Sequence, residues 1–297
     1  MSSSNERTAG FWDVMHAADG GDRENYLNHP LVAAYTSLRA SGTIVPHLDV
    51  VIAEIRARTP PGARILSPGC GSGRKEAALA RALPDRFVVA GDIAEAALQQ
   101  GREHAAREGL RNIEFVVQDF NDIHLEPRSL AAIVGMGALH HIENLEQFWA
   151  ETRRALQPGG VVMGQEYIGP NRFQWTDAQV EEGDRVLRDI VPAEHKVVHA
   201  RVVRTPVEEI VSYDPSEAVR SIELLPTLRE AGFELAGYAS AGGALLQPVL
   251  NKQIHTFDPR NWQHNLVLSR LFAEEDALMA AGRLGDDFCM FVTQPLP

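Results

Sequence analysis

The stretch RILSPGCGSGR, residues 64–74, determines how the rest of the chain is organised. It begins as a short apolar strand, continues into a glycine-rich turn, and is followed at once by a helical pattern, KEAALARAL. Gly69, Gly71 and Gly73 allow positive φ angles and leave no Cβ between the backbone and a ligand. Backbone N–H groups at such a turn, and at the start of the next helix, form a site for polar or anionic groups. The sequence therefore predicts a ligand site at this strand–turn–helix junction.

An acidic residue closes the next apolar run, FVVAGD, and narrows the choice of ligand. Asp92 lies at about the spacing from the turn at which an acid reaches a ribose hydroxyl in Rossmann-type units. The dinucleotide fingerprint G-x-G-x-x-G requires glycine where this chain has Arg74. The turn and the acid together predict a nucleoside cofactor, and the glycine spacing disfavours a nicotinamide dehydrogenase.

Apolar runs alternate with helical patterns through the middle of the chain. Strands are expected at residues 65–66, 87–92, 113–118, 131–136 and 161–166, with helices near 75–83, 94–108 and 145–156. Strands buried on both faces that alternate with helices form a parallel, doubly wound sheet. Ligands bind outside the carboxyl ends of such strands. The glycine turn, Asp92, Asp119 and residues 136–141 all fall at those ends.

Further elements flank this alternating region. Helices are expected at residues 31–40 and 46–58, ahead of the glycine turn. Asp214-Pro215-Ser216-Glu217 has the pattern of a helix start, and this helix is expected to reach Ala231 with a kink at Pro226. FELAGYAS and FCMFVTQP are expected to be the sixth and seventh strands, with a helix from Asp258 to Ala281 between them.

Several of these stretches resemble the class I S-adenosylmethionine-dependent methyltransferases. G-C-G-S-G after a strand resembles motif I of that family. Asp92 resembles the acid that binds the ribose, and Asp119-Phe120 resembles the pair that holds the adenine. ALHHIENLEQFWAETRRALQPGGVV, residues 138–162, resembles the exit of strand 4, the next helix and the L-x-P-G-G turn. The resemblance covers roughly residues 60–166.

The resemblance implies S-adenosyl-L-methionine as the cofactor. It implies these binding residues: Gly69, Cys70, Gly71, Gly73, Asp92, Ile93, Asp119, Phe120 and Met136. The family usually carries an acid two residues before the first glycine, where it helps to hold the methionyl amino group. This chain has Ser67 there. That end of the cofactor is therefore expected either to bind differently or to be held by another residue.

The resemblance and the pattern together give the expected architecture. It is an α/β fold, a doubly wound, mostly parallel seven-stranded Rossmann-like sheet with the last strand antiparallel at the edge. Residues 1–60 are expected to form a helical lid and 61–166 the cofactor-binding core. Residues 167–220 are too long for a simple connection and predict an inserted cap. Residues 221–297 are expected to complete the core with a helical insert.

The residues expected to act on the acceptor lie at the ends of strands 4 and 5. A sulfonium methyl donor needs the acceptor placed in line, and a base only when the acceptor carries a proton. His140 and His141 are the candidate bases, and Glu166 is expected to orient the acceptor or balance the sulfonium charge. Tyr26, Tyr167 and Arg172 are the candidate substrate-binding residues. The alternative is that these side chains hold the loop, anchor helices or lie in solvent.

Composition restricts the partners. The net charge of −12, from 28 basic and 40 acidic residues, provides no basic excess for a nucleic-acid backbone. Two cysteines, Cys70 and Cys289, indicate a reducing compartment and no disulfide framework. No Cys/His cluster has the spacing of a metal site, so no metal is expected. Neither a signal-peptide pattern nor an apolar run of bilayer length is present in the sequence, which predicts a cytoplasmic protein without a membrane partner. The oligomeric state stays open.

The function that fits these features is methyl transfer to a small-molecule acceptor, a sugar or a secondary metabolite. A large cap favours an enclosed small acceptor over a protein or a polynucleotide. One alternative keeps the fold and the cofactor but cyclises or cleaves S-adenosylmethionine. Another is a non-catalytic module that binds a nucleoside.

Overall fold

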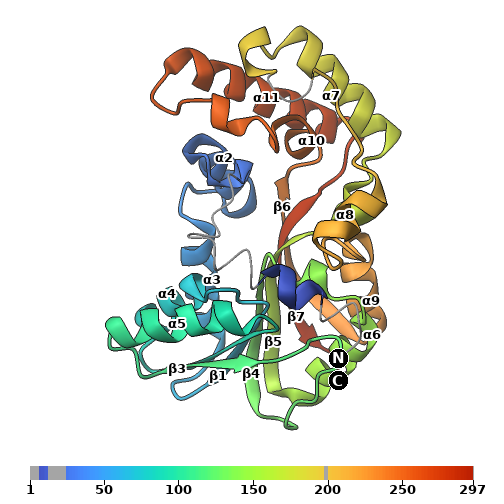
Figure 1. The fold of residues 1–297 in the computed structure, drawn as a ribbon. Helices are drawn as coiled ribbons and strands as arrows, with labels where there is room; N and C mark the ends of the chain where they lie inside the picture. Colours follow the sequence, from blue (N-terminus) through green and yellow to red (C-terminus); the bar gives the residue numbers. More distant parts are fainter. Residues whose placement is uncertain (1–6, 13–24, 197–199, 297) are drawn as a thin grey trace.

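A computed structural model describes residues 7–12, 25–196 and 200–296 of the chain. Its centre is a seven-stranded sheet of order β3-β2-β1-β4-β5-β7-β6 (Figure 1). The strands are β1 (Arg64–Pro68), β2 (Phe87–Asp92), β3 (Ile113–Val117), β4 (Leu130–Met136), β5 (Leu156–Tyr167), β6 (Phe233–Gly242) and β7 (Phe288–Pro295). β1 to β5 pair in parallel, whereas β7 pairs antiparallel with β5 and β6. The expected seven-stranded, mostly parallel sheet with an antiparallel last strand is confirmed. The edge position expected for that strand is wrong, because β7 lies between β5 and β6 and β6 forms the edge.

The central strands are apolar on both faces because helices cover both faces. Neighbouring residues point to opposite sides of a strand. Ile65 of β1 belongs to an apolar cluster with residues of α3 (His47–Arg58) and α4 (Arg74–Ala82), whereas Leu66 belongs to another with residues of α6 (Leu145–Ala155) and α9 (Leu224–Glu230). Burial of all seven residues of β4 follows from its place in the middle of the sheet. Helix α5 (Glu95–Arg107) covers β2 and β3.

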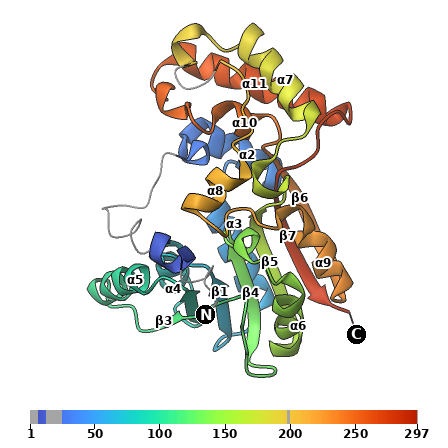
Figure 2. The ribbon, with the colours of Figure 1, turned by 45° about the vertical axis from the view of Figure 1, so that its right-hand side comes forward.

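A second helical layer lies beyond one end of the sheet (Figures 1 and 2). Its helices are α2 (Pro30–Ser41), α7 (Asp177–Asp189), α10 (Leu246–Leu250) and α11 (Trp262–Ala280). One apolar cluster joins them and includes Val32, Leu187, Leu246 and Leu268. The layer therefore combines three separate parts of the chain, and α8 (Val207–Tyr213) lies between it and the sheet (Figure 2). The division into a lid, a core and a cap stays a prediction.

The helix expected from Asp214 does not form there, and this prediction is wrong. The Asp214 carboxylate does accept the Ser216 N–H, as a cap would, at 2.9 Å. However, Ala218 has a φ of 47°, and the Val219 N–H donates to the carbonyl of His140. The chain is thereby tied to the exit of β4 instead of continuing as a helix, and only a 3-10 turn at Ser221–Glu223 precedes α9.

Two further helix details differ from expectation. Pro226 lies in the first turn of α9, where its missing N–H has no intrahelical partner to lose, so no kink is required. Helix α11 begins at Trp262 rather than at Asp258, because the side chain of Asn261 accepts the Gln263 N–H and caps the helix.

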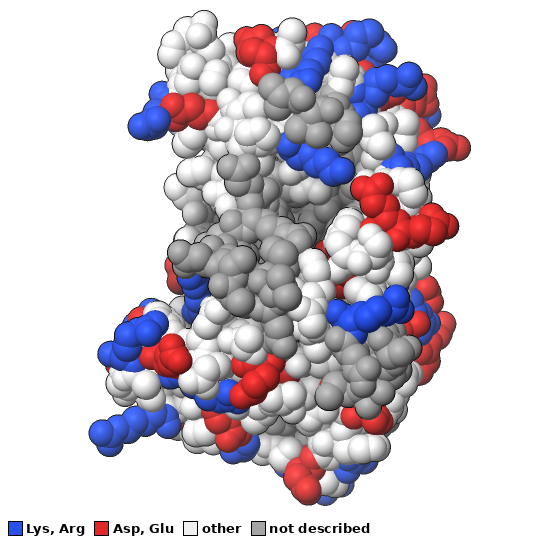
Figure 3. Space-filling model, viewed as in Figure 1, with Lys and Arg blue, Asp and Glu red and all other residues white. Residues whose placement is uncertain are grey.

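The distribution of charge and the composition of the helices bear on the possible partners. On the face drawn in Figure 3, basic and acidic side chains are interspersed over the parts that are described. Within the described ranges, no helix combines the length and apolar composition needed to cross a membrane. The expected absence of a nucleic-acid partner stays a prediction.

Candidate functional site

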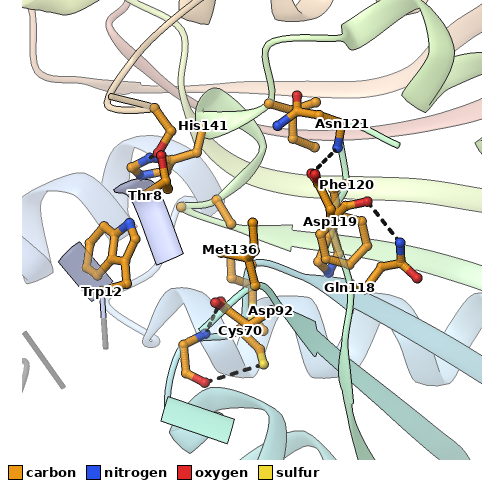
Figure 4. A pocket seen from close by; sticks show the side chains of 18 of the residues that line it. Thr8, Trp12, Cys70, Asp92, Gln118, Asp119, Phe120, Asn121, Met136 and His141 are labelled. Atoms are coloured by element: carbon orange, nitrogen blue, oxygen red, sulfur yellow. Dashed lines mark hydrogen bonds between the residues drawn. The ribbon is translucent and has the colours of Figure 1, made fainter. Parts of the chain in front are cut away.

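A cavity of about 430 Å³ lies at the carboxyl ends of the central strands. Its lining joins the glycine turn, the ends of β2 and β4, the segment after β3, the helical residues 7–12 and the turn that follows α8. In Figure 4, Thr8, Trp12 and His141 lie on one side of the cavity and Gln118, Asp119 and Phe120 on the other. Met136 lies between the two sides, above Asp92.

The glycine turn and Asp92 form one hydrogen-bonded unit. Gly71 has a φ of 54°, a conformation that residues with a Cβ rarely adopt. Its N–H donates to Asp92 Oδ2 at 2.7 Å, and the Ala94 N–H donates to Asp92 Oδ1 at 2.9 Å. A carboxylate oxygen accepts about two hydrogen bonds. Both oxygens of Asp92 thus keep capacity for further donors while the turn holds the side chain in place.

The other predicted cofactor residues also meet at this cavity. Gly69, Cys70, Gly71, Asp92, Ile93, Asp119, Phe120 and Met136 all line it. The Asp119 carboxylate accepts the Asn121 N–H at 2.9 Å, which orders the segment after β3. Gly73 is not among the lining residues: a Cβ there would lie 2.2 Å from the ring of Phe115, so packing accounts for this glycine. Direct contact of the lining residues with a cofactor stays a prediction.

The pair His140 and Glu166 is buried behind the cavity. His140 is 9% exposed and Glu166 is fully buried, and neither lines the cavity. Glu166 Oε1 accepts the N–H groups of three consecutive residues, 137–139, and its Oε2 lies 2.9 Å from His140 Nδ1. Burial alone would lower the pKa of His140, but the hydrogen bond and charge of Glu166 outweigh it and raise that pKa. Burial would likewise raise the pKa of Glu166, yet the interaction with His140 lowers it. The arrangement is therefore a buried ion pair that shapes the exit of β4.

His141 is the histidine that lines the cavity. Its Nδ1 lies 3.0 Å from Ser216 Oγ, and Ser216 Oγ donates to Asp214 Oδ1 at 2.7 Å. A serine hydroxyl has one proton, so with that proton given to Asp214, Nδ1 of His141 must be the donor to Ser216. Burial and, next, the charge of His140 lower the pKa of His141. His141 is thus held neutral, with Nε2 as the nitrogen able to accept a proton.

The histidine pair also meets an acid from the turn after α8. Ligand atoms of His140, His141 and Glu217 lie within 4.8 Å of one another, a spacing that could hold a cation. His140 Nε2 is 3.7 Å from Glu217 Oε1. The sequence suggested no metal because Glu217 lies 76 residues after His141 and only the fold brings it near. The expectation that the protein uses no metal stays untested.

The three predicted substrate residues lie outside the cavity lining. The Tyr26 hydroxyl is buried without a hydrogen-bond partner among the described residues, and its ring contacts that of Phe288. The Tyr167 hydroxyl donates to the carbonyl of Pro170, and its ring centroid is 6.0 Å from that of His140. Arg172 donates to the carbonyl of Glu217. Tyr167 and Arg172 thus lie beside the histidine pair, through the His140 ring and through Glu217. Contact with an acceptor stays a prediction for all three residues.

The sequence reasoning missed several lining residues. Thr8 and Trp12 come from the helical residues 7–12, and Trp12 contacts the His141 ring edge-on with centroids 5.8 Å apart. Glu76, in the first turn of α4, also lines the cavity, and Ser67 Oγ donates to its Oε1 at 2.8 Å. The substitution of the usual family acid by Ser67 was the available signal for Glu76.

Comparisons with known proteins agree with this geometry. Residues 65–160 match the family described as a methyltransferase domain. The malonyl-(acyl-carrier protein) O-methyltransferase of Methylococcus capsulatus is 33% identical over 131 residues, which are 43% of this chain and 47% of that protein. The chain spans between 24% and 47% of the length of the curated relatives it matches.

Solved structures share the fold over nearly the whole chain. The geranyl diphosphate C-methyltransferase of Streptomyces coelicolor, in a complex with Mg²⁺, geranyl diphosphate and S-adenosyl-L-homocysteine, has a TM-score of 0.58 at 11% identity and covers 99% of each chain. The [4+2]-cyclase SpnF has a TM-score of 0.53 at 14% identity and covers 97% of this chain and 95% of its own.

The strand order and the cavity at the strand ends define a Rossmann-like methyltransferase fold. The chain contains a class I S-adenosylmethionine-dependent methyltransferase domain. S-adenosyl-L-methionine is bound in the solved structure of a geranyl diphosphate methyltransferase that shares the fold, with a TM-score of 0.55 at 12% identity and coverage of 84% of each chain. The residues present suit it: Asp92 offers two acceptor oxygens, and the glycine turn allows close approach of a ligand.

Proposed function

We propose that this protein transfers the methyl group of S-adenosyl-L-methionine to a small-molecule acceptor. The observation that carries the proposal is the single cavity in which the glycine turn with Asp92 meets Asp119-Phe120 and His141. The glycine turn with Asp92 suits the ribose, and Asp119-Phe120 suits the adenine. His141 presents a neutral imidazole on the side of the cavity opposite Asp119 and Phe120 (Figure 4). A nucleoside bound by the first two groups would thus share the cavity with a proton acceptor.

The bound cofactor supplies an electrophilic methyl group on its sulfonium sulfur. The protein then has two tasks: to place the acceptor atom in line, and to remove its proton where it has one. We assign the second task to His141. Its Nδ1–H is held by Ser216, which leaves Nε2 to take the proton, and its lowered pKa keeps it unprotonated at neutral pH.

His140 and Glu166 have a different role in this proposal. Both are buried and bind each other, and Glu166 also accepts hydrogen bonds from the backbone of residues 137–139. They act as positioning residues that fix the loop carrying His141. The positive charge of His140 also makes a second positive charge on its neighbour unfavourable, and thereby favours neutral His141.

The proposal of a small acceptor draws support from the relatives. Their names specify a malonyl group on an acyl carrier protein and geranyl diphosphate, a small isoprenoid. An acceptor of this size class, including a secondary metabolite or a sugar, fits a protein whose cavity is covered by residues 7–12 and by the turn after α8.

A test of the function follows the products of S-adenosylmethionine. Purified protein is incubated with the cofactor and with candidate acceptors, and mass spectrometry identifies the products. We expect S-adenosylhomocysteine to form only when an acceptor is present. Methylthioadenosine without any acceptor would instead indicate cleavage. Conversion of an added substrate without loss of cofactor would indicate a cyclase. This outcome is included because the [4+2]-cyclase SpnF has a similar fold.

The role of His141 has its own test once an acceptor is known. His141→Ala should lower the single-turnover rate at saturating cofactor by about 10²–10⁴-fold, the usual range for loss of a general base. Cofactor affinity should change little. Ser216→Ala, which leaves the imidazole present but removes its orienting partner, should give a smaller loss. Equal rates in the wild type and in His141→Ala would exclude His141 as the base.

A further inference from the structure

Glu76 is a buried acid that the mechanism above does not use. It is 2% exposed, lies in the first turn of α4 and lines the cofactor cavity. Its Oε1 accepts a hydrogen bond from Ser67 Oγ at 2.8 Å. Its Oε2 is buried and has no hydrogen-bond partner among the residues that the structure describes.

Burial of such an oxygen is unfavourable unless a ligand donates a hydrogen bond to it. Burial of a carboxylate costs free energy when its oxygens lack donors, and burial raises the pKa of Glu76 for this reason. The neighbouring residue Lys75 is not the donor to Oε2, because its Nζ donates to the carbonyl of Met136 at 2.7 Å. A donor with positive charge, presented from the cavity, would satisfy Oε2.

The position of Glu76 also accounts for the departure at Ser67. In the family, an acid at this position of the first strand helps to hold the methionyl amino group of the cofactor. Here Ser67 is fully enclosed and too short to reach a ligand with a charge of its own. It instead binds the carboxylate of Glu76, nine residues further along the chain, at the same end of β1. The acid is thus supplied by the helix instead of the strand.

We propose that Glu76 binds the ammonium group of the methionyl end of the cofactor, with Ser67 as the residue that orients its carboxylate. The inference rests on S-adenosylmethionine as the ligand proposed above, but not on methyl transfer. An ammonium group offers three donors and a positive charge, which matches one unpartnered carboxylate oxygen.

The test compares two ligands that differ only in this amino group. Isothermal titration calorimetry measures the wild type with S-adenosylhomocysteine and with its deaminated analogue, in which hydrogen replaces the amino group. We expect the wild type to bind S-adenosylhomocysteine at least about tenfold more tightly, the effect of one hydrogen bond to a charged group. Glu76→Gln should lose this preference: its affinity for S-adenosylhomocysteine should fall by about tenfold or more, and that for the deaminated analogue by less than about twofold.

Two controls make the outcomes decisive. Glu103→Gln changes an exposed acid of α5 outside the cavity lining and should keep the wild-type preference. Ser67→Asp combined with Glu76→Gln returns the acid to the strand and should restore part of the preference, which a purely structural role of Glu76 would not produce. Equal binding of both ligands by the wild type, or an equal loss of both in Glu76→Gln, would overturn the inference. Failure of the wild type to bind either ligand would instead overturn the proposed cofactor.

Discussion

Replacement of Asp92 is the most direct test of the cofactor site. Asp92→Ala removes the carboxylate that accepts the Gly71 N–H at 2.7 Å and the Ala94 N–H at 2.9 Å. It also removes the two oxygens proposed to accept the ribose hydroxyls. A hydrogen bond to a charged group contributes about 1.5–3 kcal/mol. Loss of one such bond weakens binding about tenfold or more, and loss of two weakens it by at least about 150-fold.

The assay is calorimetric titration with S-adenosylhomocysteine, accompanied by thermal unfolding of the ligand-free protein. Asp122→Ala is the matched control, because it removes an exposed acid outside the cavity lining and should bind like the wild type. Asp92→Asn keeps the size of the side chain but loses its charge and one acceptor, so its affinity should lie between those of Asp92→Ala and the wild type. An unchanged affinity in Asp92→Ala, with an unchanged unfolding temperature, would refute the assignment of this cavity to the cofactor.

Three further predictions concern the turn, the buried ion pair and a second buried acid. Gly71→Val should abolish S-adenosylhomocysteine binding in calorimetry while circular dichroism keeps the helix signal, because the φ of 54° is unfavourable for a branched residue and its side chain would occupy the space that the ligand needs. Normal binding would place the ligand elsewhere. Glu166→Gln should lower the free energy of unfolding in urea by about 3–5 kcal/mol and lower the pKa of His140 in an NMR titration, because it removes one partner of a buried pair; an unchanged His140 pKa would contradict that pairing. Burial raises the pKa of Asp287 to about 7. The native state therefore holds a proton that the unfolded chain loses near pH 4, so this stabilising contribution is complete below pH 4 and is lost as the pH rises to 7, by at most about 4 kcal/mol. Asp287→Asn should flatten this part of the stability profile in urea unfolding from pH 4 to 8, and an unchanged slope would count against the raised pKa.

The sheet was predictable because its pattern is local. β1, β2 and β4 are apolar runs that a helix follows before the next strand, and a parallel sheet with helices on both faces is the arrangement that buries such runs. The glycine turn and Asp92 were predictable for the same reason, since backbone conformation and strand ends are encoded by neighbouring residues. The helix expected at Asp214 failed because a tertiary contact, the Val219 N–H to the His140 carbonyl, replaced the local preference.

The sequence by itself predicted the doubly wound, mostly parallel sheet, the cofactor class and the glycine turn at the end of the first strand. The tertiary structure decided which acids and histidines face the cavity. His140 and His141 are adjacent in the chain, yet Glu166 takes one into the interior while Ser216 holds the other at the cavity. Ser67 signalled in the sequence that the usual acid is missing, but the sequence did not point to Glu76. The role proposed for Glu76 depends on an unpartnered oxygen, and hydrogen bonds are satisfied or left open only when distant groups have been brought together. The physical reason is that periodicity records which side of an element is buried, whereas the partner met on that side is set by packing.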